Sequence, residues 1–540
     1  MMAMRWLPVL GLMAAMGCTP ATGPQVPLAG DEIKPSYGGQ LALRTRADPI
    51  DYDPSYQGRN STWAFAQAYN SLLGFNSGPD VEYTDMVVRP ELAERWEVSP
   101  DAKTFTFHLR KGVRYANLPP VNGRELTAAD AKWSIEYWSR TGEIKEKKLP
   151  QSRNEFMYAG LESVTAVGPY AVEVRFKDAF VPFLAYAASD MNPIVPREIY
   201  DQDGHLQDRI VGMGPFQLDP DTSQKGTRWV WRKNPAYWDE GKPYLDEVRW
   251  LVLPEGATAY AAFRSKQLHG LSDLNYQDFQ EAIKASPGAR SFKYLQPNAA
   301  YVRLSQMPGR PLTDIRVRQA VSLALDRDEV NKIFTGGEGI WALPGAMAGL
   351  FTEAEAKQAL RHDLAEAKRL LAEAGHAGVM LELPVDNARS QSEVTLYQLI
   401  QAQLKKADIN VDLKFMDLNS QRQKRLAGEF DLDVSTGLLP LEAGSDSTLF
   451  SDYHSTSGPG LNYARIRDPQ LDRLLEAQRG EPQPGKRREL LRATVKRVTD
   501  MMWTAALVYP PKWDMIQPDV ENYHPHFSDR GAHLFAWFKK

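Results

Sequence analysis

The chain has 540 residues, which is too long for one hydrophobic core, so two or three lobes are expected. Hydrophobic residues make up 43% of the sequence and charged residues 24%, as in ordinary folded proteins. The 64 Lys and Arg against 68 Asp and Glu leave a net charge of −4 at pH 7. Binding to a phosphate backbone requires a positive surplus that this chain lacks, so nucleic acid is excluded as the expected partner.

The N-terminus has the features of an export signal. One positive charge, at Arg5, precedes an apolar run over 6–16 that is too short to span a bilayer. Small residues then lead to Cys18, the only cysteine in the chain, in a pattern that resembles a bacterial lipobox. We predict a signal peptide over 1–17 and a lipid on Cys18. The alternatives are cleavage by an ordinary signal peptidase after Gly17 and an incidental thiol.

The stretch after Cys18 is rich in proline and glycine and has no apolar period. It predicts a tether over 18–35. Together with the lipid, this places the mature protein in the periplasm or on the outer face of the cytoplasmic membrane.

The first half of the chain is rich in strand signals. Apolar and polar residues alternate over 104–109 and 172–176 and around Trp229 and Trp231. A helix is predicted to start at Thr127, whose hydroxyl can cap it while Asp130 reaches back three residues later.

The second half alternates helices with strands. Helical spacing over 317–324 and 491–502 predicts two helices, and Asp363 and the Asp468-Pro469 pair predict the starts of two more. Strands are predicted over 410–416 and 508–509. Together, the predicted strands and helices of the two halves indicate a mixed α/β protein.

The sequence contains no zinc-protease, serine-hydrolase, P-loop or EF-hand motif, and no cysteine pair for zinc. His524 and His526 offer at most two metal ligands, and an exposed loop is the alternative interpretation. We therefore expect no enzyme activity, no cofactor and no metal.

The chain contains a series of short motifs in fixed order: 92–96 (LAERW), 104–113 (TFTFHLRKGV), 126–130 (LTAAD), 212–216 (GMGPF), 234–238 (NPAYW), 243–248 (PYLDEV), 314–320 (DIRVRQA), 324–327 (ALDR) and 367–375 (AKRLLAEAG). Taken together, they resemble the extracellular solute-binding proteins of family 5 (the peptide, nickel and opine type). Each motif alone is weak, but their order over most of the chain is specific.

The resemblance implies an α/β fold of two lobes, the type II (Venus-flytrap) periplasmic-binding-protein fold, with an extra domain inserted in lobe one. The corresponding ranges are 36–75, 205–297 and 507–540 for lobe one, 76–204 for the inserted domain and 298–506 for lobe two. Two crossing strands, 298–304 and 508–513, would join the lobes. Such a hinge closes when ligand contacts both sides.

The resemblance also implies where ligand binds. The ligand-binding candidates are Asn60, Trp63 and Tyr276 in lobe one, Tyr301 and Tyr509 on the crossing strands, and Glu442, Ser445 and Asp446 in a loop of lobe two. In peptide binders of the family, an aspartate in a W-x-x-D-x-x-D-P-like stretch pairs with the ligand's ammonium group. The matching stretch of this chain lacks the tryptophan, so Glu442 or Asp446 is the candidate for that role, and solvated loop residues are the alternative.

The expected function is that of a monomeric receptor that captures oligopeptides or peptide-like solutes and delivers them to the permease of an ABC importer. The altered loop keeps open a second hypothesis, in which the same receptor takes an opine, an oligosaccharide or a metal chelate. A secreted hydrolase is a distant alternative without motif support.

Overall fold

The computed structural model describes residues 35–49, 51–56, 62–78, 81–83, 86–296, 299–347, 349–387, 389–436, 444–458, 460–527 and 536–539. Cys18, Asn60 and Glu442 lie outside these residues, as do the predicted signal peptide and almost all of the tether. The stretch Ser36–Lys540 forms one unit. Within the described part, no helix is long and apolar enough to cross a membrane.

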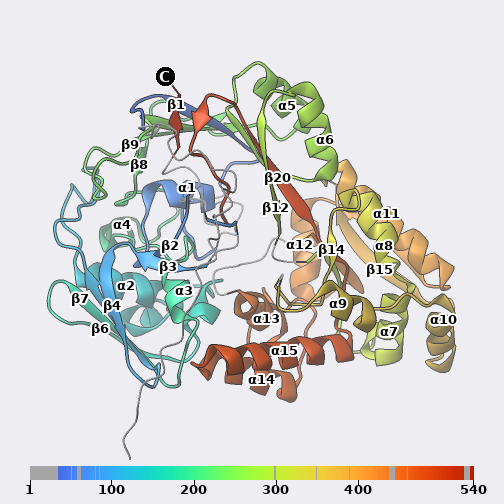
Figure 1. Cartoon of the computed structure of the whole chain (residues 1–540). Helices are drawn as coiled ribbons and strands as arrows, with labels where there is room; N and C mark the ends of the chain where they lie inside the picture. Colours follow the sequence, from blue (N-terminus) through green and yellow to red (C-terminus); the bar gives the residue numbers. More distant parts are fainter. Residues whose placement is uncertain are drawn as a thin grey trace, which may run out of the picture. The chain divides into compact units, whose positions relative to one another are not determined.

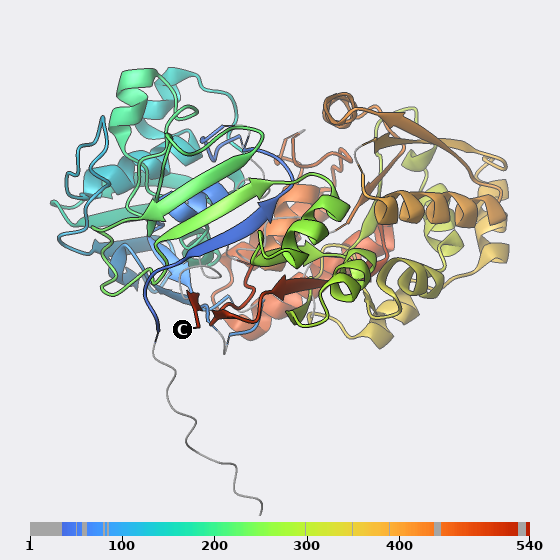
Figure 2. The same cartoon turned by 90° about the horizontal axis from the view of Figure 1, so that it is seen from above.

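A seven-stranded sheet takes its strands from three separate stretches of the chain (Figures 1 and 2). In spatial order they are β12 (Arg290–Leu295), β20 (Pro511–Ile516), β11 (Gly270–Leu274), β1 (Gln40–Thr45), β10 (Glu247–Val252), β9 (Arg228–Lys233) and β8 (Phe216–Leu218). β1 is parallel to β10 and β11, and the other neighbours are antiparallel. Helices α5 (Gly256–Arg264) and α6 (Tyr276–Ala285) pack beside β11 and β20, where the rings of Phe279 and Trp513 stack.

A separate four-stranded antiparallel sheet comes from the first half of the chain. Its order is β4 (Ala93–Val98), β5 (Thr104–Leu109), β7 (Ala171–Phe176) and β6 (Leu161–Ala166). Every second residue of β5 is buried, and α2 (Ala128–Ser139) packs against β6 and β7. Asp130 accepts the Thr127 N–H (2.9 Å) in a capping box, so the predicted strands and helix start are confirmed.

The stretch between 301 and 506 is mostly helical and carries small sheets. A three-stranded sheet has the order β17 (Leu432–Ser435), β13 (Tyr301–Leu304) and β18 (Thr504–Ala506), and β15 (Met380–Asp386) runs parallel to β16 (Asn410–Met416). The helices are α7 (Ile315–Ala324), α8 (Arg327–Thr335), α9 (Glu353–Ala359), α10 (Leu364–Glu373), α11 (Gln391–Lys406), α12 (Leu418–Ala427), α13 (Ser445–Tyr453), α14 (Pro469–Gly480) and α15 (Pro484–Met501).

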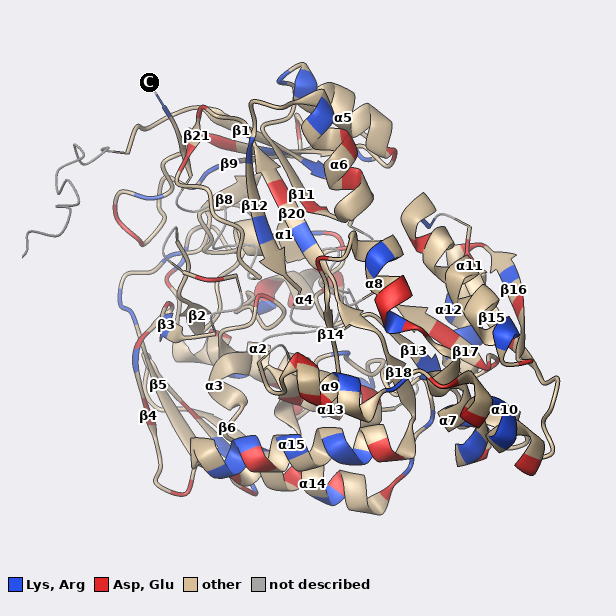
Figure 3. Cartoon of the chain, turned by 45° about the vertical axis from the view of Figure 1, so that its right-hand side comes forward, with Lys and Arg blue, Asp and Glu red and all other residues tan. Residues whose placement is uncertain are grey.

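The helix starts predicted for this stretch are confirmed by their caps. Asp363 accepts the Glu366 N–H (3.0 Å) at the start of α10, and Asp468 accepts the Leu471 N–H (2.7 Å) at the start of α14. Helix α15 carries six basic and two acidic residues, and Figure 3 shows charged residues of both signs along it.

The remaining elements are short. They are α1 (Thr62–Ala68), α3 (Phe183–Ala187), α4 (Arg197–Asp203), β2 (Leu73–Phe75), β3 (Val88–Pro90), β14 (Ile340–Trp341), β19 (Val508–Tyr509), β21 (Val520–Glu521), β22 (Trp537–Phe538) and the 3₁₀ turns η2 (Gly142–Lys147), η3 (Glu155–Tyr158) and η4 (Pro311–Thr313).

Two backbone segments connect the seven-stranded sheet to the three-stranded sheet (Figure 1). The Gln296 N–H donates to the Pro510 carbonyl (3.0 Å), and the Ala300 N–H donates to the Val508 carbonyl (2.8 Å). The segments before β13 and after β18 therefore run side by side, where crossing strands are expected. The domain boundaries themselves stay predictions.

Candidate ligand-binding site

Helix α13 brings together several of the predicted ligand-binding residues. Ser445 and Asp446 form its first turn, and Asp452 lies near its end. Tyr301, on β13, donates its hydroxyl hydrogen bond to Asp452 (3.0 Å). Ser445, Asp446 and Tyr301 are all buried. One short helix thus carries two of the predicted residues, Ser445 and Asp446, and contacts a third, Tyr301, from a distant part of the sequence.

Tyr509 approaches the same helix through the segment that follows β14. Its buried hydroxyl donates to the Ala346 carbonyl (2.8 Å), and the next residue, Met347, donates its N–H to the Ser445 hydroxyl (3.1 Å). A chain of contacts therefore runs from β19, which is part of the second connecting segment, through Ala346 and Met347 to the first turn of α13. Sequence reasoning did not identify Met347, because a methionine in a loop carries no signal of its own.

Asp446 is fully buried and its carboxylate already has partners. It accepts hydrogen bonds from the guanidinium of Arg479 (2.9 and 3.0 Å), the amide of Gln478 and the hydroxyl of Tyr186 (2.5 Å). Burial alone would raise the pKa of Asp446, but the charge and hydrogen bonds of Arg479 and the Tyr186 hydroxyl hold it below its ordinary value. The carboxylate is therefore ionised at neutral pH and paired within the protein.

The other two described candidates lie apart from α13. Trp63, on α1, packs against Trp250 of β10 with ring centroids 4.9 Å apart, and its indole N–H is buried without a hydrogen-bond partner. Tyr276 begins α6 and packs against Trp513, with ring centroids 6.1 Å apart. Its ring also lies over Gly336 at the end of α8.

α6 makes a polar contact to the helical stretch as well. Asn275, which caps α6, donates its side-chain amide to the Ser392 hydroxyl on α11 (2.9 Å). Lys293 on β12 pairs with Glu338. The start of α6 thus contacts α11, and the edge strand β12 contacts the turn that follows α8.

A charged cluster that sequence reasoning missed lies beside this contact. Arg389 donates to Glu393 (2.7 Å) and lies 3.9 Å from Asp386 at the end of β15, and the Thr436 hydroxyl donates to Glu393 (3.4 Å). Two carboxylates and one guanidinium, all mostly buried, leave a net charge of −1. The S-x-x-E spacing of Ser390 and Glu393 was the available signal, since it marks a capping box.

A buried acid, Asp514, lies on β20. It accepts hydrogen bonds from the Asp273 N–H (2.9 Å) and from the hydroxyls of Tyr294 (3.1 Å) and Tyr523 (2.7 Å). Burial raises its pKa to about 6 despite these donors. Tyr83 stacks on Tyr294 with ring centroids 3.9 Å apart, so this network also reaches the segment before β3.

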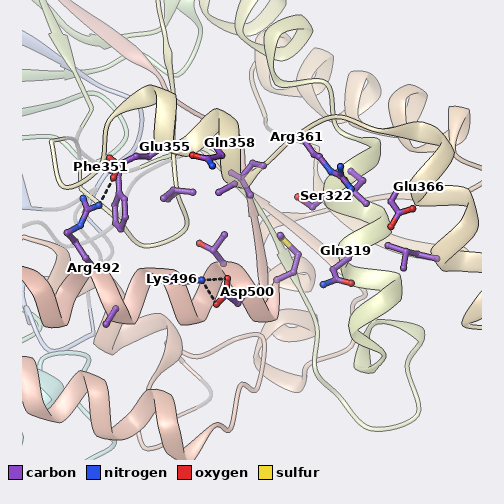
Figure 4. A pocket seen from close by; sticks show the side chains of 18 of the residues that line it. Gln319, Ser322, Phe351, Glu355, Gln358, Arg361, Glu366, Arg492, Lys496 and Asp500 are labelled. Atoms are coloured by element: carbon purple, nitrogen blue, oxygen red, sulfur yellow. Dashed lines mark hydrogen bonds and ion pairs between the residues drawn. The ribbon is translucent and has the colours of Figure 1, made fainter.

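A groove lies elsewhere, away from helix α13. It measures about 1010 Å³ and is bordered by α7, α9, α10 and α15 (Figure 4). Its charged rim is largely paired internally, for example Arg492 with Glu355 and Lys496 with Asp500. None of the six predicted ligand-binding residues that the structure describes lines it.

The model of the family described as "Bacterial extracellular solute-binding proteins, family 5 Middle" matches residues 87–458, more than two thirds of the chain. The Dipeptide-binding protein of Escherichia coli (strain K12) is 26% identical over 506 residues, which cover 89% of this chain and 91% of the relative.

Two solved structures share the fold. The ABC transporter-associated periplasmic binding protein DppA from Helicobacter pylori, in complex with the peptide STSA, has a TM-score of 0.82 at 21% identity and covers 94% of this chain and 99% of its own. The binding protein AgaA from A. tumefacien R10, in complex with agropinic acid, has a TM-score of 0.79 at 22% identity and covers 93% and 99%. The predicted type II periplasmic-binding-protein fold is confirmed.

Proposed function

The chain belongs to the bacterial extracellular solute-binding proteins of family 5, and we propose that it captures oligopeptides or peptide-like solutes for an ABC importer. Proteins of this family bind peptides or other small ligands and work with ABC permeases; they are not enzymes. The hydrolase alternative is therefore dropped. The observation that carries the peptide assignment is the near full-length similarity to a dipeptide-binding protein.

We place the ligand's ammonium group near the Asp386–Arg389–Glu393 cluster or at Glu442, rather than on Asp446. Asp446 has both carboxylate oxygens occupied by Arg479, Gln478 and Tyr186, and an incoming cation would have to displace a buried partner. The cluster has an excess negative charge and lies where β15 and β17 end. A cation placed there gains charge-assisted hydrogen bonds without breaking the Arg479 pair.

An opine is the second candidate ligand. The loop before α13 departs from the pattern of the peptide binders, and AgaA, which holds agropinic acid, has a similar fold. Those opines that keep a basic secondary amine beside their carboxylates would suit the same charged cluster as the ammonium group of a peptide.

We further propose that the protein is monomeric and is held at the outer face of the cytoplasmic membrane, or in the periplasm, by a lipid on Cys18. The family is extracellular, and Cys18 follows an apolar run that ends in small residues. The tether over 18–35 would leave the folded part free to meet both solute and permease.

Ligand identity is tested by native mass spectrometry of the purified full chain, followed by thermal denaturation with a panel of di- to pentapeptides and with agropinic acid. A ligand at 100 times its Kd stabilises the folded state by about 2.7 kcal/mol, which raises the melting temperature measurably. Stabilisation by peptides supports the first proposal. Stabilisation by agropinic acid with no response to any peptide overturns it in favour of the second.

A further inference from the structure

A buried ion pair lies where the stretch 76–204 meets the stretch 298–506. Arg479, in the last turn of α14, holds both oxygens of Asp446 in a bidentate arrangement (2.9 and 3.0 Å). The exposed fractions of the two side chains are 5% and 0%. The guanidinium lies over the rings of Phe450, at 3.3 Å from the centroid, and Phe180, at 5.1 Å. Both charges are thus shielded from water by apolar surface from the two stretches.

Three hydrogen bonds cross between the stretches at this pair. The Tyr186 hydroxyl donates to Asp446 (2.5 Å), the Arg479 guanidinium donates to the Phe156 carbonyl (3.1 Å), and the Val181 N–H donates to the Arg479 carbonyl (2.8 Å). In each crossing bond, the group contributed by the stretch 76–204 is neutral. Both members of the ion pair belong to the other stretch.

Because both charges lie in the stretch 298–506, separation of the two stretches would cost little electrostatic free energy. Opening would leave Asp446 and Arg479 paired with each other and would return both to water, which lowers their desolvation penalty. Among the described contacts of this pair, the losses would be three hydrogen bonds to neutral groups and the contact of Phe180 with the guanidinium. Such bonds contribute only modest net free energy, because water replaces them. Separation of the two stretches at this pair would therefore leave no buried charge without its partner.

The same pair is connected to the segments that join the two sheets. Asp446 and Ser445 are neighbours in the first turn of α13, Ser445 accepts the Met347 N–H, and the adjacent Ala346 accepts the Tyr509 hydroxyl. A change at either end has a continuous path of packed contacts to the other.

We propose that Tyr186, Asp446 and Arg479 form a closure latch, which holds the stretch 76–204 against α13 and α14 and slows the release of bound solute. Its effect on solute release rests on the proposed function. Its existence as a closure contact does not, because all of its groups belong to the protein.

Hydrogen exchange of the Val181 amide in the ligand-free full chain tests the latch, since this amide donates to Arg479 only in the closed arrangement. Tyr186→Phe removes one crossing hydroxyl and keeps the ring, so Val181 should exchange about two to ten times faster. Tyr453→Phe is the matched control: Tyr453 lies on α13, as Asp446 does, and its buried hydroxyl donates to Thr504 within the stretch 298–506 (2.9 Å). Unchanged exchange in Tyr186→Phe, or equal acceleration in both variants, would overturn the latch.

A second measurement adds a pool of di- to pentapeptides to the wild type. Slower exchange at Val181 in the presence of the pool supports coupling between the latch and peptide capture. If the pool has no effect while Tyr186→Phe still accelerates exchange, the latch stands as a closure contact and its coupling to peptide capture is overturned. The two measurements therefore distinguish a failure of the peptide proposal from a failure of the latch.

Discussion

The ring of Tyr276 lies directly over Gly336, so closely that a Cβ atom on Gly336 would come within 2.3 Å of the ring. Gly336 ends α8 with a φ of +68°, and Tyr276 begins α6 beside the seven-stranded sheet. The glycine therefore serves two purposes: it takes the left-handed conformation that ends the helix, and it lets α6 approach.

Gly336→Ala tests this contact, and Gly337→Ala is its control. Both glycines have positive φ, but a Cβ on Gly337 would meet nothing within 4 Å. The control should lose about 1–2 kcal/mol from backbone strain alone. Gly336→Ala should lose at least a further 1 kcal/mol from the clash with Tyr276, measured by denaturant unfolding. Equal losses would mean that the ring moves aside freely.

The buried pair of Asp446 and Arg479 should be costly to break. Arg479→Met leaves a buried carboxylate uncompensated, and we expect the free energy of unfolding to fall by about 3–5 kcal/mol. Arg369→Met is the comparison, because Arg369 pairs with Glu366 at a surface where its side chain is 54% exposed. That change should cost at most about 1 kcal/mol. Similar losses in the two variants would contradict the burial argument.

Asp514 should make stability depend on pH in an unusual direction. Its pKa in the folded state, about 6, lies above the ordinary value of 3.8, so the folded state binds the proton more tightly than the unfolded state. Its contribution is fully present below pH 4 and is lost as the pH rises to about 6, by roughly 2–3 kcal/mol. Denaturant unfolding of the wild type and Asp514→Asn should show this difference between pH 4 and 7. A pH-independent difference would show that Asp514 titrates normally.

Glu393→Gln tests the site proposed for the ligand's ammonium group. The glutamine keeps an acceptor for the capping box with Ser390 but removes the charge. Binding of peptides with a free N-terminus should weaken roughly tenfold or more, while binding of the same peptides with an acetylated N-terminus should change little. Isothermal calorimetry measures both. Glu366→Gln, on the surface of α10, is the control, and equal weakening for both peptide forms would place the ammonium group elsewhere.

Cys18→Ser tests the lipid anchor. The variant should move from the membrane fraction to the soluble periplasmic or secreted fraction, because the thiol that carries the acyl chains is absent. Mass spectrometry of the wild-type N-terminal peptide should show a diacylglycerol adduct on Cys18. An unmodified Cys18, or a mature N-terminus after a different residue, would favour the ordinary signal peptidase.

The sequence alone determined much of the local structure and the family. The alternation over 104–109 predicts β5, and Asp363 and Asp468 predict the starts of α10 and α14. These signals succeed because alternation and capping depend on residues a few positions apart. The ordered motifs likewise pointed to the family, and through that resemblance to the fold, because they span strands such as β5 and helix starts such as that of α7.

The partners of Asp446 were decided only by the tertiary structure. From sequence it is one of two acids in a polar loop, available to a ligand. In the fold, Arg479 and Tyr186, which are 33 and 260 positions away, take up its carboxylate. Likewise, the sequence of β20 gives no sign that Asp514 will be buried between Tyr294 and Tyr523. Burial and pairing depend on which distant segments the topology brings together, and periodicity and capping carry no information about that.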